Sequence, residues 1–358
     1  YIGERLVKTK MISYNGYMPY IIRMSFKLNS LLICALMALA VIPGTSSAEQ
    51  IDSEIINSSV PGSTTTFGWS SPADPKGVVV FIHGGGWFGD HDPSSHAEVP
   101  SYYHDKGPDQ GWATLSVAYR SGFVKSVADV REAYIIARSK VGRYKPVCSL
   151  GVSAGGHLSL ILSIAERSMD CAVSEGGIVD LIDTTESTQG FVDFWLYDAT
   201  PEYLKSLSPV YLFSERGLAE SRNVLMGTVA DDRYAKLNRL ADTNDEINQN
   251  GGTSELRILD PETDGVPFIH SFATADSVAS YQKALDSTLS QAITRRMNLK
   301  VFEQIGRKQK AIKQKLSLFK DRHTYPRFPK RTFWRVVRKM KRLQSEKMGL
   351  KTNLPDSV

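Results

Sequence analysis

The stretch PVCSLGVSAGGHLSLILSIA, residues 146–165, decides the fold of this 358-residue chain. Its first part is an apolar run that predicts a buried strand, and His157 to Ala165 is rich in Leu and Ile and predicts a helix. Between them, Gly151-Val152-Ser153-Ala154-Gly155 has the G-x-S-x-G pattern of a serine on a sharp strand-to-helix turn. Glycine is required on both sides of a turn so crowded. Ser153 is therefore the candidate nucleophile.

A glycine-rich motif lies about seventy residues upstream of this serine. His83-Gly84-Gly85-Gly86-Trp87 directly follows the apolar run from Gly77 to Ile82. Backbone without side chains approaches a substrate closely, so its N–H groups are suited to hold a developing negative charge. We expect an oxyanion hole formed by the N–H groups of Gly85, Gly86 and Ala154. Trp87 is expected either to wall the substrate pocket or to belong to the core.

A serine nucleophile also needs a base and an acid, which follow it in the order acid, then histidine, in folds of this kind. Elimination leaves His270 as the base. His83, His91, His96 and His104 precede Ser153, His157 lies one helical turn after it and is expected to pack or cap there, and His323 lies in a basic tail. The acid should follow the apolar strand from Val224 to Gly227. Asp231 is preferred, and Asp232 is the alternative.

Apolar runs alternate with helical patterns along the middle of the chain. Strands are expected near 63–69 and at 77–82, 112–119, 146–152, 171–174, 222–229 and 255–259, and helices at 126–141, 157–165 and 277–293. This order predicts an α/β fold with a mostly parallel sheet flanked by helices. Residues 180–215 break the alternation and are rich in aromatic residues, which favours a small cap over the site.

These segments resemble the α/β-hydrolase superfamily, and within it the HGGG-type carboxylesterases that are similar to hormone-sensitive lipase or to feruloyl esterases. The matching segments are 79–89, 117–120, 150–158, 206–210, 226–232 and 265–272, in the family order. The resemblance implies hydrolysis of carboxylic esters through an acyl-enzyme, without a metal or an organic cofactor. One departure is an extra residue between Gly227 and Asp231, which leaves Asp232 open as the acid. The short cap argues against long-chain triglycerides.

The N-terminal region predicts export. From Met24 to Ala48 a lysine-bearing stretch, a twelve-residue apolar run and small residues follow one another, as in a secretory signal. Residues 1–23 are interpreted as upstream or fragment sequence, and a retained anchor is the alternative to cleavage. The catalytic domain is then expected at 49–294, and the protein is expected to be secreted or periplasmic.

Cys148 and Cys171 fall on neighbouring predicted strands, so a disulfide and two buried free thiols are both open.

Residues 295–358 form a basic extension, with 20 lysines and arginines against four acids, whereas residues 49–294 carry 18 basic and 33 acidic residues. Phe333, Val336, Val337, Met340 and Leu343 recur at helical spacing among basic residues. Such a helix suits an anionic membrane or envelope surface, and a solvated, partly disordered tail is the alternative. Nucleic acid is not an expected partner of an exported protein.

The leading hypothesis is a serine esterase acting on small or carbohydrate-linked acyl or aryl esters. A serine peptidase of the prolyl-oligopeptidase type shares the fold, but it would need a large accessory domain. A catalytically silent binding module would be expected to lack a member of the triad, whereas candidates for all three are present.

Overall fold

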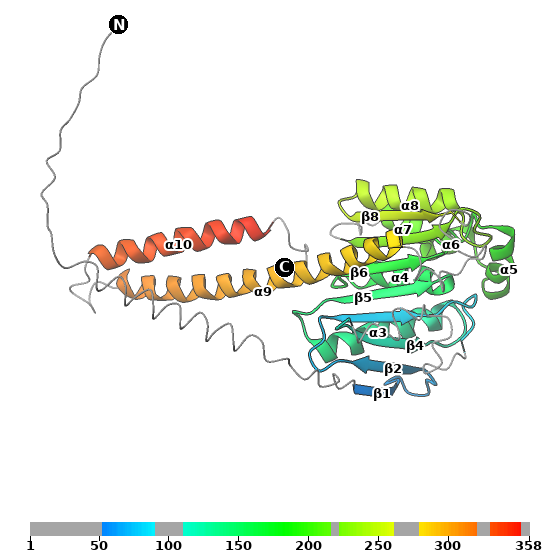
Figure 1. Ribbon diagram of the computed structural model, residues 1–358, viewed down its shortest axis with the longest axis horizontal. Coiled ribbons are helices and arrows are strands. Elements are labelled where there is room, and N and C mark those ends of the chain that lie inside the picture. Colours follow the sequence, from blue (N-terminus) through cyan, green and yellow to red (C-terminus); the bar gives the residue numbers. More distant parts are fainter. Residues whose placement is uncertain (1–51, 90–109, 216–221, 261–278, 321–329, 352–358) are drawn as a thin grey trace, which may run out of the picture. The chain divides into compact units, whose positions relative to one another are not determined.

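The computed structural model describes residues 52–89, 110–215, 222–260, 279–320 and 330–351 (Figure 1). Their strands are β1 (Asp52–Asn57), β2 (Thr66–Ser71), β3 (Val78–Ile82), β4 (Ala113–Ala118), β5 (Val147–Val152), β6 (Cys171–Glu175), β7 (Asn223–Val229) and β8 (Thr253–Leu259). They form one sheet in the order β1-β2-β4-β3-β5-β6-β7-β8. β1 and β2 are antiparallel to their neighbours, and β4, β3, β5, β6, β7 and β8 run parallel.

Helices cover both faces of this sheet. They are α3 (Phe123–Val141), α4 (Ala154–Ala165), α5 (Glu186–Trp195), α6 (Pro201–Leu207), α7 (Pro209–Glu215), α8 (Leu237–Gln249), α9 (Ala279–Lys320) and α10 (Lys330–Lys351). Successive side chains of β3 alternate between two cores. Val78, Val80 and Ile82 pack with residues of α3, α4 and α8, whereas Val79 and Phe81 pack on the face that holds Tyr281 and Leu285 of α9. The parallel sheet flanked by helices confirms the expected fold class.

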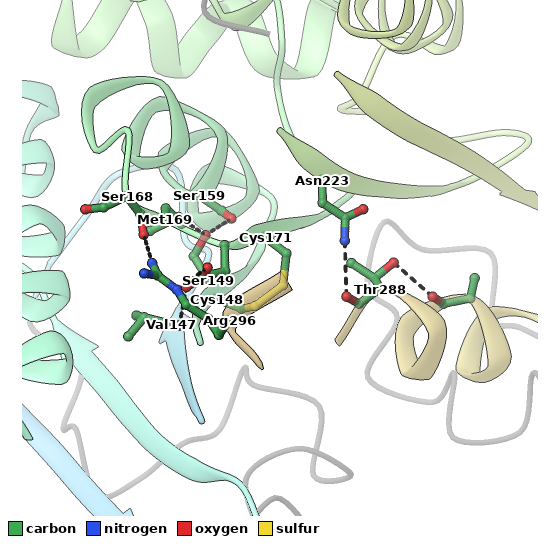
Figure 2. The surroundings of a disulfide bond; sticks show 12 residues. Val147, Cys148, Ser149, Ser159, Ser168, Met169, Cys171, Asn223, Thr288 and Arg296 are labelled. Carbon is green, nitrogen blue, oxygen red and sulfur yellow. Dashed lines mark hydrogen bonds and ion pairs between the residues drawn. A yellow bond between two sulfur atoms is a disulfide. The ribbon is translucent and has the colours of Figure 1, made fainter. Parts of the chain in front are cut away.

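Cys148 and Cys171 form a disulfide between β5 and β6, where they are paired in register (Figure 2). Both are buried on the face that α9 covers. The parallel strands place the two Cα atoms 4.6 Å apart, within the range that a disulfide spans. Of the two alternatives that the sequence left open, the structure contains the bonded one.

α9 is anchored near the starts of β5 and β6 by Arg296, which is nearly buried. Its Nε donates to Asp170 Oδ1 (2.5 Å), and its Nη atoms donate to the carbonyls of Arg143 and Ser168. Asp170 also accepts from Arg138 and from the Val147 N–H at the start of β5. The buried carboxylate is thus compensated by two guanidinium groups and a backbone donor, as a buried charge must be.

The structure corrects four expectations about the elements. Asp52–Asn57 forms edge strand β1, which was not predicted, and the strand expected near 63–69 lies at Thr66–Ser71. Helix α8 was not predicted. The helix expected to end at Ile293 continues to Lys320, so position 294 lies inside α9 and not at its end.

The basic extension contains helix α10, which packs on α9. Leu343 is 8% exposed, and the Lys347 ammonium lies 4.3 Å from the centre of the Phe302 ring of α9. The apolar stripe that suggested contact with an anionic membrane or envelope surface therefore faces another helix over part of its length. None of the described helices combines the length and the apolarity that a bilayer span requires.

Candidate active site

Ser153 stands on the turn between β5 and α4, which we call the nucleophile elbow (residues 151–155). Its backbone has φ 56° and ψ −119°, a conformation that non-glycine residues rarely adopt. The turn is fixed to the end of β6, because the Ser153 N–H donates to the Glu175 carbonyl (2.8 Å). Ser153 is partly exposed, whereas its neighbours Val152 and Ala154 are buried. The strained backbone thus presents a serine outward from an otherwise closed turn.

The two glycines of the elbow stand where no side chain fits. A Cβ at Gly151 would lie 2.0 Å from the Gly155 carbonyl oxygen, and a Cβ at Gly155 would lie 2.0 Å from that of Ile82. The second contact reaches another segment, because Ile82 ends β3 and immediately precedes the HGGG motif. This close backbone approach brings together the G-x-S-x-G and HGGG motifs, which lie far apart in the sequence.

The HGGG motif forms a loop with an unusual run of backbone angles, which we call the oxyanion loop (residues 83–87). Gly85, Gly86 and Trp87 have φ values of 88°, 61° and 61°. The start of the loop is fixed by Tyr119, whose hydroxyl donates to the Gly84 carbonyl (2.8 Å) and whose ring stacks on His83 at 3.9 Å. Glycine tolerates these angles, but tryptophan does so only at a cost in free energy.

Trp87 is a core residue. Its side chain is 1% exposed and lies 4.4 Å from the Phe123 ring, measured between ring centres. Its indole N–H donates to His157 Nδ1 (3.3 Å). Of the two roles that the sequence allowed for Trp87, the structure shows packing in the core, and a contact with substrate stays a prediction.

The cap segment (residues 180–215) folds into α5, α6 and α7, and α5 presses on the oxyanion loop. The Trp195 indole N–H donates to the Gly86 carbonyl (2.8 Å), and a Cβ at Gly86 would lie 2.5 Å from the Phe191 ring. Phe88 packs on Trp195 with 4.7 Å between ring centres. The aromatic residues of this segment predicted a cap, but their contact with the oxyanion loop was not predicted.

A cleft of about 760 Å³ opens beside this aromatic contact, between the start of α3 and the segment from α5 to α6. Trp195, Tyr197 and Tyr203 line it, together with Val124 and Lys125. Tyr197 is 84% exposed and Tyr203 is 42% exposed. Aromatic rings and polar groups therefore face open solvent next to α5, the helix that contacts the oxyanion loop.

The two candidate acids after β7 have different surroundings. Asp231 is exposed. Asp232 is half-buried, and its Oδ1 accepts the N–H groups of Tyr234 (2.8 Å) and Ala235 (2.9 Å), while its Oδ2 accepts the Thr228 hydroxyl (3.0 Å). A carboxylate held in this way has a fixed orientation, which a triad acid needs. The surroundings therefore fit Asp232 better than Asp231.

His270 lies outside the described residues, so its role as the base stays a prediction. His157, which the sequence expected to pack or cap, lies in the first turn of α4 and is fully buried. Burial lowers its pKa from 6.5 to about 4, although a hydrogen bond with the Leu207 carbonyl opposes the shift. In the described part of the chain, no group of three or more His, Cys, Asp or Glu side chains is placed to hold a metal ion.

Comparisons with known proteins agree with this geometry. The BD-FAE family model matches residues 70–215, which contain the oxyanion loop, the elbow and the cap segment. No curated protein matches the sequence. Among solved structures, an esterase/lipase from an uncultured bacterium is 17% identical with a TM-score of 0.53, over 70% of this chain and 86% of its own.

Two further solved structures give the same result. Carboxyl esterase 2 from the mycorrhizal fungus Tuber melanosporum is 17% identical with a TM-score of 0.53, over 70% of this chain and 88% of its own. An esterase from the bacterial hormone-sensitive lipase family is 18% identical with a TM-score of 0.52, over 68% and 84%. The protein has the α/β-hydrolase fold of esterases and lipases. Over residues 70–215 the chain is similar to the BD-FAE family, and the resemblance drawn from the sequence is confirmed.

Proposed function

We propose that the protein hydrolyses carboxylic esters through an acyl-enzyme formed on Ser153. The observation that carries this proposal is the elbow itself. Ser153 has a strained backbone and is partly exposed, and Gly155 packs against the backbone from which the oxyanion loop begins. Strain of this kind persists only where the surroundings enforce it, and it is common at catalytic residues.

The proposed reaction uses two side chains and three backbone N–H groups. Ser153 Oγ attacks the ester carbonyl and gives its proton to His270. The oxyanion that forms accepts hydrogen bonds from the N–H groups of Ala154, Gly85 and Gly86. When the C–O bond to the alcohol breaks, His270 returns the proton to the leaving oxygen, and water then hydrolyses the acyl-enzyme by the same route.

Asp232 is the better candidate for the acid that orients His270, because three donors fix its carboxylate whereas Asp231 is exposed. The matched pair Asp231→Asn and Asp232→Asn tests this assignment. We expect Asp232→Asn to lower kcat by about 10⁴-fold and Asp231→Asn to change it little. The opposite ranking would restore Asp231 as the acid.

For the substrate we propose esters of small acyl or aryl acids, including esters linked to carbohydrate. Support comes from the short helices of the cap and from the aromatic, partly polar cleft beside them. A series of p-nitrophenyl esters of increasing chain length, beside feruloyl, acetyl-xylan and prolyl-amide substrates, tests this. Preference for the amide would favour a serine peptidase, and the absence of all turnover would favour a binding module.

Ser153→Ala is the control for every substrate in that series. It removes the nucleophile while leaving the helix start intact, so we expect kcat to fall by about 10⁴-fold or more. Ester turnover that survives in this variant would overturn the proposed mechanism.

We propose further that the protein is exported and works outside the cytoplasm. The disulfide between Cys148 and Cys171 supports this, because disulfides persist in oxidising compartments. N-terminal sequencing of the secreted or periplasmic protein tests the proposal. A mature chain that starts at Glu49 would support cleavage of the signal after Ala48, and a chain that stays in the cytoplasm with free thiols would contradict export.

We also propose that α10 binds anionic surfaces by charge. Part of its apolar stripe faces α9, so attraction to lipid headgroups has to come from exposed cations. Those on α10 include Arg335, Arg338, Lys339 and Lys341. Such attraction is screened within about 10 Å at 0.1 M salt, so we expect binding to weaken as the salt concentration rises.

Co-sedimentation with phosphatidylglycerol vesicles, compared with phosphatidylcholine vesicles, tests this surface. The variant replaces four cations of α10 by glutamine, and a matched control replaces four exposed cations of the body: Lys125, Lys205, Arg233 and Lys283. We expect only the first variant to lose binding to the anionic vesicles. Equal binding by both variants would contradict a role for α10.

A further inference from the structure

The oxyanion loop ends on a backbone conformation that needs an external support. Gly85 and Gly86 adopt positive φ at little cost, but Trp87 follows them with φ 61° and carries the largest side chain there is. Such a residue keeps that conformation only where its surroundings over-determine it. The direction of the N–H groups of Gly85 and Gly86 therefore depends on what holds Trp87.

Three contacts hold Trp87. Its carbonyl accepts the Gly122 N–H (2.9 Å), its ring packs on Phe123, and its indole N–H donates to His157 Nδ1 (3.3 Å). The first two come from the start of α3. The contact with His157 comes from the first turn of α4, four residues after Ser153.

His157 makes a second hydrogen bond that fixes its tautomer. Its Nε2 lies 2.8 Å from the carbonyl oxygen of Leu207, the last residue of α6 in the cap segment. A carbonyl only accepts, so Nε2 carries the proton, and Nδ1 is then the acceptor that the Trp87 indole requires. The buried ring stays neutral at neutral pH, because its pKa is lowered to about 4. Both ring nitrogens are therefore used at once.

We propose that His157 is a positioning residue for the oxyanion hole. Ser153 directly precedes α4, which carries the Ala154 N–H and His157, and His157 ties the loop that supplies the other N–H donors to this helix. The two halves of the oxyanion hole are thereby set by one rigid element, and the cap segment is connected to it through Leu207. This inference rests on the proposed ester hydrolysis.

The test separates the two hydrogen bonds of His157. In His157→Asn the short amide lies near the place of Nδ1 and keeps an acceptor for Trp87, whereas in His157→Gln the longer amide reaches the place of Nε2 and keeps a donor for Leu207. His157→Leu keeps neither bond. We expect His157→Leu to lower kcat for p-nitrophenyl acetate about 10- to 100-fold with KM within about twofold, because a misplaced oxyanion donor weakens transition-state binding only. His157→Asn should recover most of kcat, and His157→Gln should not.

Trp87→Phe provides an independent check, because it removes the indole N–H and keeps an aromatic ring. Its loss of kcat should match that of His157→Leu, and the double variant should lose no more than either single one, since both remove the same bond. In ¹⁵N NMR spectra, His157→Gln should shift the Trp87 indole cross-peak, and His157→Asn should leave it near its original place.

The outcomes are distinguishable. Turnover by the wild type with unchanged kcat in His157→Leu, or additive losses in the double variant, would overturn the positioning role and leave the proposed function intact. Where His157→Leu does not fold, the contrast between the Asn and Gln variants decides, and equal kcat in these two would overturn the role. A wild-type protein that hydrolyses no ester would overturn the proposed function and this inference with it.

Discussion

The nucleophile elbow and the pair formed by α9 and α10 are packed in different ways. At the elbow, backbone meets backbone, and a Cβ at Gly155 would stand 2.0 Å from the Ile82 carbonyl oxygen. In the helical pair, side chains meet, and a Cβ at Gly306 of α9 would stand 3.5 Å from the Lys347 ammonium, an ordinary contact. The elbow therefore tolerates almost no change in shape, whereas the helical pair has room.

This difference explains why short motifs identify one region and only composition describes the other. Where a carbonyl oxygen leaves no space for a Cβ, glycine has to stand at that position, and a fixed motif appears in the sequence. A helix that packs through long, basic side chains leaves a statistical pattern of charge and spacing. If the two regions also differ in energy, a substitution at the elbow should lower stability far more than one in the helical pair.

The largest effect is expected at Gly155. Gly155→Ala forces the elbow away from the end of β3, so we expect it to lower the free energy of unfolding by about 4 kcal/mol or more and to abolish ester turnover. Chemical denaturation and an esterase assay measure the two effects. A Gly155→Ala protein with normal stability and activity would show that the close approach is not essential.

The disulfide between β5 and β6 is expected to contribute about 3 kcal/mol, because it closes a loop with a sequence separation of 23 residues. Replacing Cys148 and Cys171 together by alanine should lower the midpoint of urea unfolding accordingly. The oxidised and reduced wild-type proteins form the matched comparison. Identical midpoints for these two would mean that the bond adds nothing to stability.

Acid should destabilise the protein through His157. The folded-state pKa of about 4 lies below the value of 6.5 in the unfolded chain, so the unfolded chain binds the proton first as the pH falls. Stability is then lost between pH 6.5 and pH 4, by about 3 kcal/mol in total, and this group adds no pH dependence above that range. Denaturation curves at pH 7 and pH 4 should show a smaller acid loss in His157→Asn, and equal losses would contradict a buried neutral imidazole.

The smallest effect is expected at Gly306. Gly306→Ala replaces a flexible residue inside a helix without a clash, so we expect it to raise stability by about 0.5–1 kcal/mol and to leave kcat unchanged. It is the counterpart of Gly155→Ala at a site with room for a Cβ. A loss of stability as large as that at Gly155 would remove the contrast between the two regions.

The sequence predicted much of the sheet, because buried strands are continuous apolar runs. The strand expected at 77–82 is observed at Val78–Ile82, and the turn after β5 lies where G-x-S-x-G placed it. β1 escaped prediction because its residues are mostly exposed and polar. α8 escaped because it has few apolar positions, of which Leu240 and Ile247 are buried.

The contacts that complete the candidate site could not be predicted in the same way. The bond from Trp195 to Gly86 joins residues 109 positions apart, and the bond from His157 to Leu207 joins residues 50 positions apart. No local pattern encodes such pairs, and only the aromatic richness of the cap segment hinted at them. The choice between Asp231 and Asp232 likewise depended on the turn after β7, where the hydrogen bonds of Asp232 favour the residue that the sequence ranked second.

We propose above all that the elbow presents Ser153 as a nucleophile. Reaction with p-nitrophenyl acetate, quenched in acid within the first turnover and followed by peptide mass spectrometry, measures this directly. We expect an acetyl group on Ser153 in the wild-type protein and none on the corresponding peptide of Ser153→Ala. Acetylation of another residue during turnover, or full turnover by Ser153→Ala, would contradict it.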